Sequence, residues 1–385
     1  MADSLARAFA IAALAGTVAG IAYTAFAIAR VRAFRKRDCS TEPQTLPPIT
    51  VLKPLHGDEP DLYENLRSFC DQDYPEFQIV FGTSDESDAA LAVAERLARE
   101  FADRDIRINR GCEIQAENPK VANLMGMWPH AKHGLLVIAD SDIRVGREYL
   151  RALAASFDDA QAGAVTCLYG GTPNDTLASS LGAMFVNDQF APSVLVALAL
   201  EPITYCFGAT MAVRRDTLER IGGLQALSER LGDDYLLGKL VTENGMRVAL
   251  CPHIVHTSVT DDSLGALWLH ELRWARTILS QRPLGYAGSV VTYLLPFAVA
   301  FAVLARTPFS FAALAVAAGL RLWLHVEAGR TFAPEGHLEP WLIPLRDALG
   351  LSIWAASFFG RRVTWRRGEY RLSAGGRMAV GPKEM

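Results

Sequence analysis

The sequence lacks several patterns that would assign it to a common class of protein. Its 385 residues carry a formal net charge of only −4, so no global charge indicates binding to nucleic acid. The six cysteines are scattered without a metal-type or redox-type pair, which predicts reduced residues of a cytosol-facing protein rather than disulfides or catalytic thiols. No Gly-x-Gly-x-x-Gly motif occurs, so Gly208, Gly222 and Gly223 are interpreted as turn glycines rather than as a phosphate-binding loop.

Charge is also absent from a long segment near the N-terminus. With 50% hydrophobic and 21% charged residues and a mean hydropathy of +0.14, the composition indicates a soluble domain joined to membrane segments. Phe9 to Ile28 is a stretch of 20 residues without a charge, long enough to cross a bilayer. Only Arg7 precedes it, so the segment is predicted to be an uncleaved anchor with the following domain in the cytoplasm. The basic residues that follow it are Arg30, Arg32, Arg35, Lys36 and Arg37.

The C-terminal region contains three further apolar segments. Leu284 to Ala305 has no charge, and Phe309 to Val326 has one arginine near its end. Trp341 to Gly360 contains Arg346 and Asp347. A third full span would place the tail outside, but the arginines of the tail favour the cytoplasmic side. We therefore predict two full C-terminal spans and a third segment that is re-entrant or interfacial.

Between these membrane segments, strands alternate with helices, as in a doubly wound α/β domain. The predicted organisation is an N-terminal anchor with its basic flank (residues 1–37), an α/β domain with an interfacial helix (38–283) and a C-terminal membrane region with a basic tail (284–385). Strands are expected at 49–52, 77–81, 106–108, 135–139, 164–168 and within 205–213. Helices are expected at 62–70, 89–101, from 118, from 147, and from 233 to about 244.

The α/β pattern centres on residues 134–142, Gly-Leu-Leu-Val-Ile-Ala-Asp-Ser-Asp. A short continuous apolar run before a turn predicts a buried central strand, and ligands of such sheets lie beyond the carboxyl ends of the strands. Asp140 and Asp142 follow this strand directly. Two carboxylates there are poor core residues but good oxygen ligands for Mg²⁺ or Mn²⁺ carrying a diphosphate.

Three acidic pairs fall where strands meet helices: Asp85/Asp88, Asp140/Asp142 and Asp233/Asp234. Capping of helix N-termini could explain the first pair and Asp233. Capping explains the pair after the central strand poorly, because one cap does not need two carboxylates. A nucleotide-sugar transferase needs such carboxylates to hold the nucleotide, bind a metal at the leaving diphosphate and take the acceptor proton.

Three other features have alternatives that the sequence leaves open. Ser263 to Ser280 predicts an amphipathic helix that suits either a membrane interface or packing against the domain. Val194 to Ile203 is short for a span and predicts core or an acceptor-side wall. His253 and His256 lie near a strand end, where a structural role is favoured over contact with a metal or phosphate.

Several short motifs occur in one order along the α/β domain: Val51–Gly57, Glu64–Leu66, Asp73–Pro75, Asn118–Leu124, Asp140–Val145, Asp233–Tyr235 and His270–Trp274. Together they resemble the ceramide glucosyltransferase group of family 2-like glycosyltransferases, which have a GT-A fold. The resemblance covers about residues 48 to 283. Within that group, residues 62–75 and 270–277 are most similar to the bacterial hopanoid-biosynthesis glycosyltransferases.

The resemblance implies how the donor is held. Asp85, or Asp88 beside it, would contact the nucleotide base. Asp140 would lie near the ribose and diphosphate, and together with Asp142, the direct ligand, it would bind Mg²⁺ or Mn²⁺. Lys120 would bind the diphosphate.

The resemblance also implies the roles of the remaining motif residues. Asp234 would be the catalytic base, with Asp233 in a position that is often Glu. Arg273 would bind the diphosphate, and Trp274 would line the acceptor side. The closing motif usually begins with Gln or Arg, and here it begins with His270, whose acceptor-side role stays open.

The implied activity is inverting transfer of a sugar from a UDP-sugar to a hydroxyl of an amphiphilic lipid, by a multi-pass protein of the bacterial inner membrane with a cytoplasmic catalytic domain. The favoured substrates are UDP-N-acetylglucosamine and bacteriohopanetetrol, in hopanoid biosynthesis. Ceramide with UDP-glucose is the alternative. A processive polysaccharide synthase is less favoured because of the few spans and His270, and a non-catalytic scaffold because all three acidic pairs are present. No nucleic-acid partner is expected.

Overall fold

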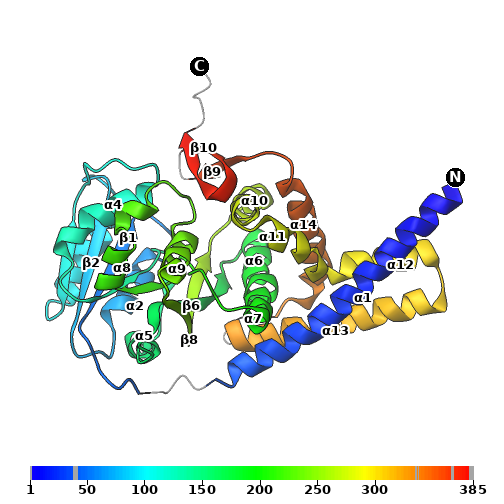
Figure 1. Ribbon diagram of the computed structural model, residues 1–385, viewed down its shortest axis with the longest axis horizontal. Coiled ribbons are helices and arrows are strands. Elements are labelled where there is room, and N and C mark those ends of the chain that lie inside the picture. The colour runs from blue at the N-terminus through cyan, green and yellow to red at the C-terminus, as the bar shows by residue number, and fades with distance from the viewer. Residues whose placement is uncertain (1, 38–41, 334–335, 337, 366–367, 381–385) are drawn as a thin grey trace.

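The computed structural model describes residues 2–37, 42–333, 336, 338–365 and 368–380. It contains a mixed eight-stranded sheet wrapped by helices, a set of long apolar helices that extends away from the sheet, and a small C-terminal sheet (Figure 1). Five cysteines of the described residues are free thiols, and Cys39 lies outside the described residues.

The central sheet has the strand order β3-β2-β1-β4-β7-β6-β8-β5. β1 pairs in parallel with β2 and β4, as the predicted α/β pattern requires, but β7 runs antiparallel to both of its neighbours, β4 and β6. The sheet is therefore mixed. Its strands are β1 (Ile49–Leu55), β2 (Phe77–Thr83), β3 (Asp105–Asn109), β4 (Leu135–Ile138), β5 (Ile143–Arg144), β6 (Ala162–Pro173), β7 (Met211–Arg214) and β8 (Arg247–Val259).

Helices bury both faces of this sheet, which explains why its central strands are continuous apolar runs. Val51 belongs to a core shared with α2, α3 and α5, whereas its neighbour Leu52 points to the core shared with α4, α8 and α9. These helices are α2 (Leu62–Cys70), α3 (Ala90–Glu100), α4 (Pro119–Met127), α5 (Tyr149–Ser156), α8 (Arg215–Arg220) and α9 (Asp233–Glu243). Short helices η1 (Trp128–His130) and η3 (Leu224–Leu227) complete this part.

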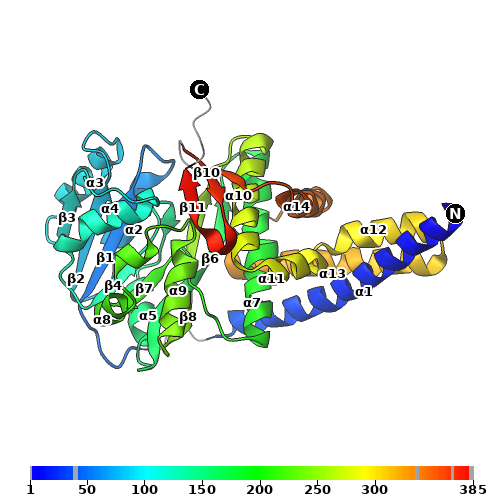
Figure 2. The ribbon, with the colours of Figure 1, turned by 45° about the horizontal axis from the view of Figure 1, so that its top comes forward.

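Three helices, α1 (Ala2–Arg35), α12 (Leu294–Ala305) and α13 (Pro308–Phe332), extend together away from the sheet (Figure 2). Ser4–Arg35 and Pro308–Phe332 are long and apolar enough to cross a membrane. They contain the predicted spans at 9–28 and 309–326. The predicted span at 284–305 is bent by 59° between Pro283–Thr292 and Leu294–Ala305, so the described residues hold two candidate spans, or three if this bent pair is one.

The last apolar segment forms α14 (Ile343–Ser357), which is not a candidate span. Its two charged residues are buried in ion pairs with other helices. Arg346 donates to both carboxylate oxygens of Glu271 at 2.6 and 2.8 Å, and Asp347 lies 3.0 Å from the guanidinium of Arg321 on α13. α14 therefore packs against neighbouring helices, which agrees with the predicted non-spanning third segment.

The remaining helices lie between the sheet and the long helices: α6 (Leu177–Met184), the π-helix η2 (Phe185–Phe190), α7 (Ala191–Leu200), α10 (Leu264–Gln281), α11 (Pro283–Gly288), η4 (Ser289–Thr292) and η5 (Pro340–Leu342). The C-terminal sheet was not predicted. It contains β9 (Arg362–Trp365), β10 (Gly368–Leu372) and β11 (Met378–Val380), with η6 (Ala374–Gly376). It is tied to the central domain by backbone hydrogen bonds, including Met378 N–H to the Glu229 carbonyl at 3.0 Å.

Candidate active site

The site forms at the carboxyl end of β4 because of the direction of β7. Since β7 is antiparallel to β4, its first residue, Met211, pairs with Ile138, the last residue of β4. The segment before β7 therefore lies beside Asp140. α9 packs closely on the same segment, where a Cβ on Gly238 would lie only 2.4 Å from the Cα of Tyr205. This packing brings the start of α9 to the end of β4.

Lys120 joins two of the predicted acidic pairs. Its ammonium lies 2.7 Å from Asp140 Oδ1 and 3.2 Å from Asp233 Oδ2. Burial alone would lower the pKa of Lys120, but the charges of Asp140 and Asp233 raise it above its ordinary value. Asn118 orients the lysine, because its side chain caps α4 by accepting from the backbone N–H groups of Lys120 and Val121.

Asp234 lies beside Asp140 across the backbone of Gly208. Gly208 donates its N–H to Asp234 Oδ2 at 2.9 Å, and a Cβ on Gly208 would lie 2.8 Å from Asp140 Oδ2. Burial and the adjacent charge of Asp233 raise the pKa of Asp234 to about 7. A carboxylate with that pKa is suited to accept a proton near neutral pH.

The capping interpretation fails for Asp233, although Asp234 bonds a backbone N–H of the first turn of α9. Gly232, the N-cap of this helix, has no side chain to cap it. The Asp233 carboxylate is directed to Lys120. Asp234 has two partners: its Oδ1 accepts from the Tyr235 N–H in the first turn of α9 at 2.7 Å, and its Oδ2 accepts from the Gly208 N–H. Gly208, interpreted from the sequence as a turn glycine, is needed here because a larger residue would collide with Asp140.

Asp142 is held by the edge of the sheet. Its Oδ2 accepts a hydrogen bond of 2.6 Å from the Thr257 hydroxyl, and Ile143 pairs with Thr257 in the β5–β8 ladder. Burial and the charge of Asp140 raise the pKa of Asp142, while the Thr257 hydrogen bond opposes that rise. The two carboxylates after β4 are therefore close enough to repel each other.

Lys53 is a part of the site to which the sequence analysis assigned no role. It is fully buried on β1, its ammonium donates to the main-chain carbonyl of Asp140, and it lies 3.9 Å from the centre of the Phe69 ring. Burial lowers the pKa of Lys53 to about 7, against the charges of Asp142 and Asp140. A lysine inside an otherwise apolar strand is the sequence signal that could have indicated this residue.

Glu59 is a second residue that the sequence analysis missed. It lies in the loop after β1, and its buried Oε2 has no hydrogen-bond partner among the described residues. Burial raises the pKa of Glu59, and the charges of Asp142 and Asp140 raise it further. A third carboxylate therefore lies close to the pair after β4.

These residues are compatible with a divalent cation. The mutual repulsion of Asp140 and Asp142 would be relieved by a cation, and both supply the oxygen ligands that Mg²⁺ and Mn²⁺ use. The described part of the chain contains no group of three or more His, Cys, Asp or Glu side chains arranged to hold a metal. The protein would therefore supply one or two ligands, and substrate phosphates and water the others, which is how Mg²⁺ commonly binds.

The first acidic pair lies apart from this cluster, after β2. Asp85 is exposed, and its Oδ1 accepts from the N–H and the hydroxyl of Ser87. Asp88 accepts from Gly57 N–H at 2.8 Å and from Ala90 N–H at 2.9 Å, so it caps the start of α3 and holds the loop after β1. The capping interpretation holds for Asp88, and Asp85 is the one with an accessible carboxylate.

The closing motif lies on α10. Arg273 is largely buried, which lowers its pKa against the opposing charges of Asp140, Asp261 and Asp142. Trp274 stacks on Phe185 of η2, with ring centres 5.8 Å apart.

His270 precedes Trp274 by one turn of α10. Its ring centre lies 4.1 Å from that of Trp274, and its Nδ1 lies 3.2 Å from Asp261. The structure thus brings Arg273 near the carboxylates, places Trp274 against η2, and holds His270 between Trp274 and Asp261.

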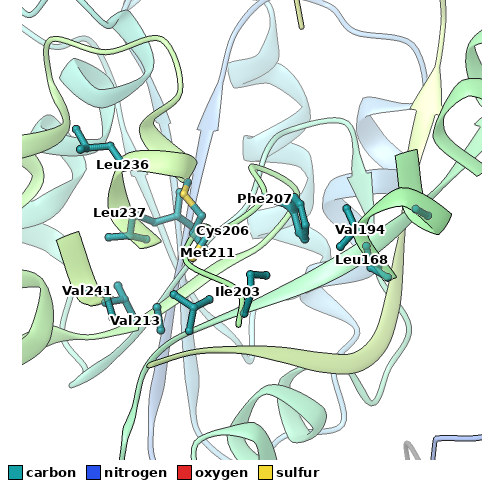
Figure 3. Close-up of a cluster of buried hydrophobic side chains, with 14 of the residues drawn as sticks. Leu168, Val194, Ile203, Cys206, Phe207, Met211, Val213, Leu236, Leu237 and Val241 are labelled. Atoms are coloured by element: carbon teal, nitrogen blue, oxygen red, sulfur yellow. The ribbon is translucent and has the colours of Figure 1, made fainter. Parts of the chain in front are cut away.

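Two plainer interpretations agree with the structure. Val194 and Ile203 belong to the buried core beneath the segment that carries Gly208, together with Cys206 and Phe207 (Figure 3). His253 is packed beside Tyr149 with a ring separation of 5.9 Å, and burial lowers its pKa to about 4. Both findings describe core residues.

The chain is similar to known transferases. It is 23% identical over 384 residues to ceramide glucosyltransferase 1 of Caenorhabditis elegans, which covers 96% of this chain and 82% of that protein. It is 25% identical over 250 residues to an N-acetylglucosaminyltransferase of Rhizobium meliloti (strain 1021), which covers 61% of this chain and 57% of that protein. Among solved structures, a mannosyltransferase from Pyrobaculum calidifontis in complex with GDP-Man and Mn²⁺ covers 91% of this chain and 99% of that chain, with a TM-score of 0.54 and 19% sequence identity.

The structural likeness confirms the predicted GT-A fold flanked by apolar helices. The family model of glycosyl transferase family 21 matches residues 12–378, which is nearly the whole chain. The predicted resemblance to ceramide glucosyltransferases is confirmed at the level of this family. The chain is therefore a hexosyltransferase and belongs to glycosyl transferase family 21.

Proposed function

We propose that this protein transfers a sugar from a UDP-sugar to a hydroxyl of a membrane lipid with inversion at the sugar carbon. The observation that carries the proposal is the position of Asp234, which has a pKa near 7 and lies beside Asp140 across Gly208. A base and a donor-binding carboxylate must be adjacent if an acceptor hydroxyl is to reach the sugar while the diphosphate leaves on the other side.

Each residue of the cluster has a place in this reaction. Asp234 accepts the proton of the acceptor hydroxyl, and Asp233 holds Lys120 in position. Lys120 and Arg273 bind the diphosphate, whose developing negative charge they stabilise. A cation bound by Asp140 and Asp142, when present, would add electrophilic stabilisation of the same leaving group.

The donor nucleotide is assigned to the edge formed by the ends of β1, β2 and β4. Asp85 has the accessible carboxylate at this edge and is proposed to contact the base, with Asp88 holding the adjacent loop. Trp274 is proposed to line the acceptor side because it stacks on η2, and His270 is assigned to the same side because its ring packs on Trp274.

The proposed location is the bacterial inner membrane, with the catalytic domain cytoplasmic. α1 would cross the membrane from the outside to the cytoplasm. The bent α11–α12 segment would enter the membrane from the cytoplasmic side, and α13 would lead the chain back to that side. α14 would then lie at the surface, because its charges pair with α10 and α13. This path puts the basic tail on the same side as the catalytic domain, in agreement with the positive-inside rule. Residues 1–37, 38–283 and 284–385 are the corresponding proposed units.

The proposed substrates are UDP-N-acetylglucosamine and bacteriohopanetetrol. Their support is the likeness of residues 62–75 and 270–277 to hopanoid-biosynthesis transferases and the relative in Rhizobium meliloti, which is described as an N-acetylglucosaminyltransferase. Ceramide with UDP-glucose is the second candidate, favoured by the similarity over 96% of the chain to a ceramide glucosyltransferase.

A transfer assay on purified membranes tests the proposal. Radiolabelled UDP-N-acetylglucosamine and UDP-glucose are offered with bacteriohopanetetrol and with ceramide, with and without Mn²⁺. Labelled hopanoid from UDP-N-acetylglucosamine is the expected product. If only ceramide is labelled, the proposed mechanism stands and the substrates are those of a ceramide glucosyltransferase. If no lipid is labelled, the proposal of a lipid acceptor is wrong.

The base is tested in the same assay. Asp234→Asn should lower turnover by roughly 10²–10⁴-fold, the usual contribution of a positioned general base, while UDP-sugar binding is retained. Asp103→Asn, at an exposed position on the opposite part of the domain, is the control and should leave turnover unchanged. Retained activity in Asp234→Asn would remove this residue as the base.

A further inference from the structure

A groove of about 1030 Å³ is lined by residues of α10, the end of α14 and the C-terminal sheet. Figure 1 shows where these three elements lie in the fold. None of its lining residues belongs to the candidate active site. Its charged lining is strongly basic, with four arginines and one glutamate. These residues are Arg276, Arg361, Arg362, Arg371 and Glu369.

The fold of the C-terminal sheet concentrates these arginines. Arg362 and Arg371 are directly opposite each other in the antiparallel ladder of β9 and β10, and the Arg361 carbonyl accepts from Leu372 N–H at 2.9 Å. All three arginine side chains are exposed. The ladder therefore places two guanidinium groups side by side on one face of this small sheet.

Hydrogen bonds from Arg276 hold one side of the groove, α10, to the opposite side. Arg276 of α10 donates to the main-chain carbonyls of Arg362 and Phe359, and so ties α10 to the segment between α14 and β9. Both acceptors are uncharged, so these bonds leave the guanidinium charge in place. Within the described residues, no carboxylate forms an ion pair with Arg276, Arg361 or Arg371.

Exposed apolar side chains lie next to the arginines. Phe358 lines the groove, Phe359 follows it with 78% of its surface exposed, and Leu284 beside the lining residue Pro283 is 88% exposed. Arginine clusters next to exposed aromatic and aliphatic side chains are typical of segments at the headgroup level of a membrane. α11, which begins at Pro283, continues through the short helix η4 into the apolar α12.

We propose that this groove binds the phosphate-bearing headgroup of an anionic phospholipid in the leaflet that faces the catalytic domain. The proposal rests on the membrane association proposed above and on neither the donor nor the acceptor. Guanidinium groups match phosphate oxygens in a bidentate geometry, and basic clusters beside membrane helices attract anionic lipids. Arg276 lies one turn from Arg273 on α10, so a bound headgroup holds the helix that carries the closing motif of the active site.

Binding is measured directly, on the full-length protein in an uncharged detergent, by the anisotropy of a fluorescent short-chain phosphatidylglycerol. Phosphatidylcholine with the same chains is the comparison and should bind more weakly. Arg361→Gln combined with Arg371→Gln should weaken phosphatidylglycerol binding by about 25-fold, at about fivefold for each arginine near an anionic headgroup. The matched control, Arg99→Gln with Arg107→Gln, removes two exposed arginines of α3 and β3 and should leave binding unchanged.

Three results would overturn the proposal: equal binding of the two phospholipids, equal binding by the Arg361/Arg371 double variant and the wild type, or displacement of the lipid by inorganic phosphate at an equal concentration. The thermal unfolding midpoint shows whether the double variant folds. If it does not, Arg371→Lys, which keeps the charge, should bind more tightly than Arg371→Gln. Because this measurement needs no turnover, it stands or fails separately from the transfer assay.

Discussion

Gly208 donates its backbone N–H to Asp234 Oδ2 at 2.9 Å, and a Cβ in its place would lie 3.7 Å from that oxygen and 2.8 Å from Asp140 Oδ2. One glycine backbone therefore separates the proposed base from the carboxylate that follows the central strand. A side chain at position 208 would therefore force the Asp140 carboxylate to move.

Gly208→Ala should lower kcat/KM because the new methyl group must displace the Asp140 carboxylate. A displacement of about 1 Å at a reacting group costs on the order of 10²-fold in rate. Gly134→Ala, at a position near β4 where a Cβ would meet nothing within 4 Å, is the matched control and should behave as the wild type. Steady-state kinetics of both variants measure the effect, and equal kcat/KM values would contradict it.

The pH dependence of kcat/KM should follow the ionisation of Asp234. The base acts as a carboxylate, so activity should rise with pH and level off above the pKa of about 7. Asp233→Asn removes an adjacent charge that raises this pKa, so the rise should move to lower pH in that variant. An unchanged profile in Asp233→Asn would contradict the electrostatic origin of the shift.

The same pKa predicts a contribution to stability. A carboxyl whose folded-state pKa is raised above its ordinary value near 3.8 is favoured when protonated, so its contribution is fully present below about pH 4. That contribution is lost as the pH rises through 7. Unfolding free energies of the wild type and Asp234→Asn should therefore diverge between pH 4 and 7, and parallel curves would exclude this linkage.

Arg346→Met should destabilise the protein, because it leaves the Glu271 carboxylate buried without its partner. Breaking a buried pair in this way costs about 3–5 kcal/mol. Replacing both residues, with Glu271→Gln and Arg346→Met, should restore much of the loss. The exposed pair Arg96–Glu100 is the control, where Arg96→Met should cost far less because water screens both charges. Chemical denaturation in detergent measures each variant, and a loss in Arg346→Met no larger than in the control would refute the prediction.

Removal of divalent cations should abolish transfer. Thr257→Val, which removes the hydroxyl bonded to Asp142, should weaken Mn²⁺ binding by about 10–100-fold, as changes in the orienting partners of metal ligands do. Asp142→Asn, which removes the proposed ligand itself, should weaken Mn²⁺ binding more than Thr257→Val does. Electron paramagnetic resonance of Mn²⁺ with UDP present measures binding separately from activity. Full activity in a chelator would exclude the metal role.

Much of the fold was predictable because its signals are local. The central strand, the Asn118 cap and the helix that begins at Asp233 lie within one or two residues of their predicted positions. Their signals are apolar runs, turn residues and helix-start residues within a few positions of one another. The ordered motifs likewise predicted a family to which the chain does belong.

The partners of buried charges were not predictable in this way. Lys53 and Asp140 are 87 residues apart, and Arg346 and Glu271 are 75 residues apart. A charge inside an apolar segment indicates that a partner exists, but only the packing of the segments shows which residue it is. The C-terminal sheet was missed because its strands are only 4, 5 and 3 residues long, although Val363, Tyr370 and Leu372 alternate with polar residues and share one small core.

The sequence by itself determined the α/β pattern, the apolar N-terminal helix and the three acidic pairs, because each depends on residues that are neighbours along the chain. Only the tertiary structure decided that β7 runs antiparallel to β4 and that α9 packs on the segment before it. Those two long-range choices bring Gly208 and Asp234 to the end of β4. The distances within the candidate site are set by strand direction and helix packing, which no local pattern encodes.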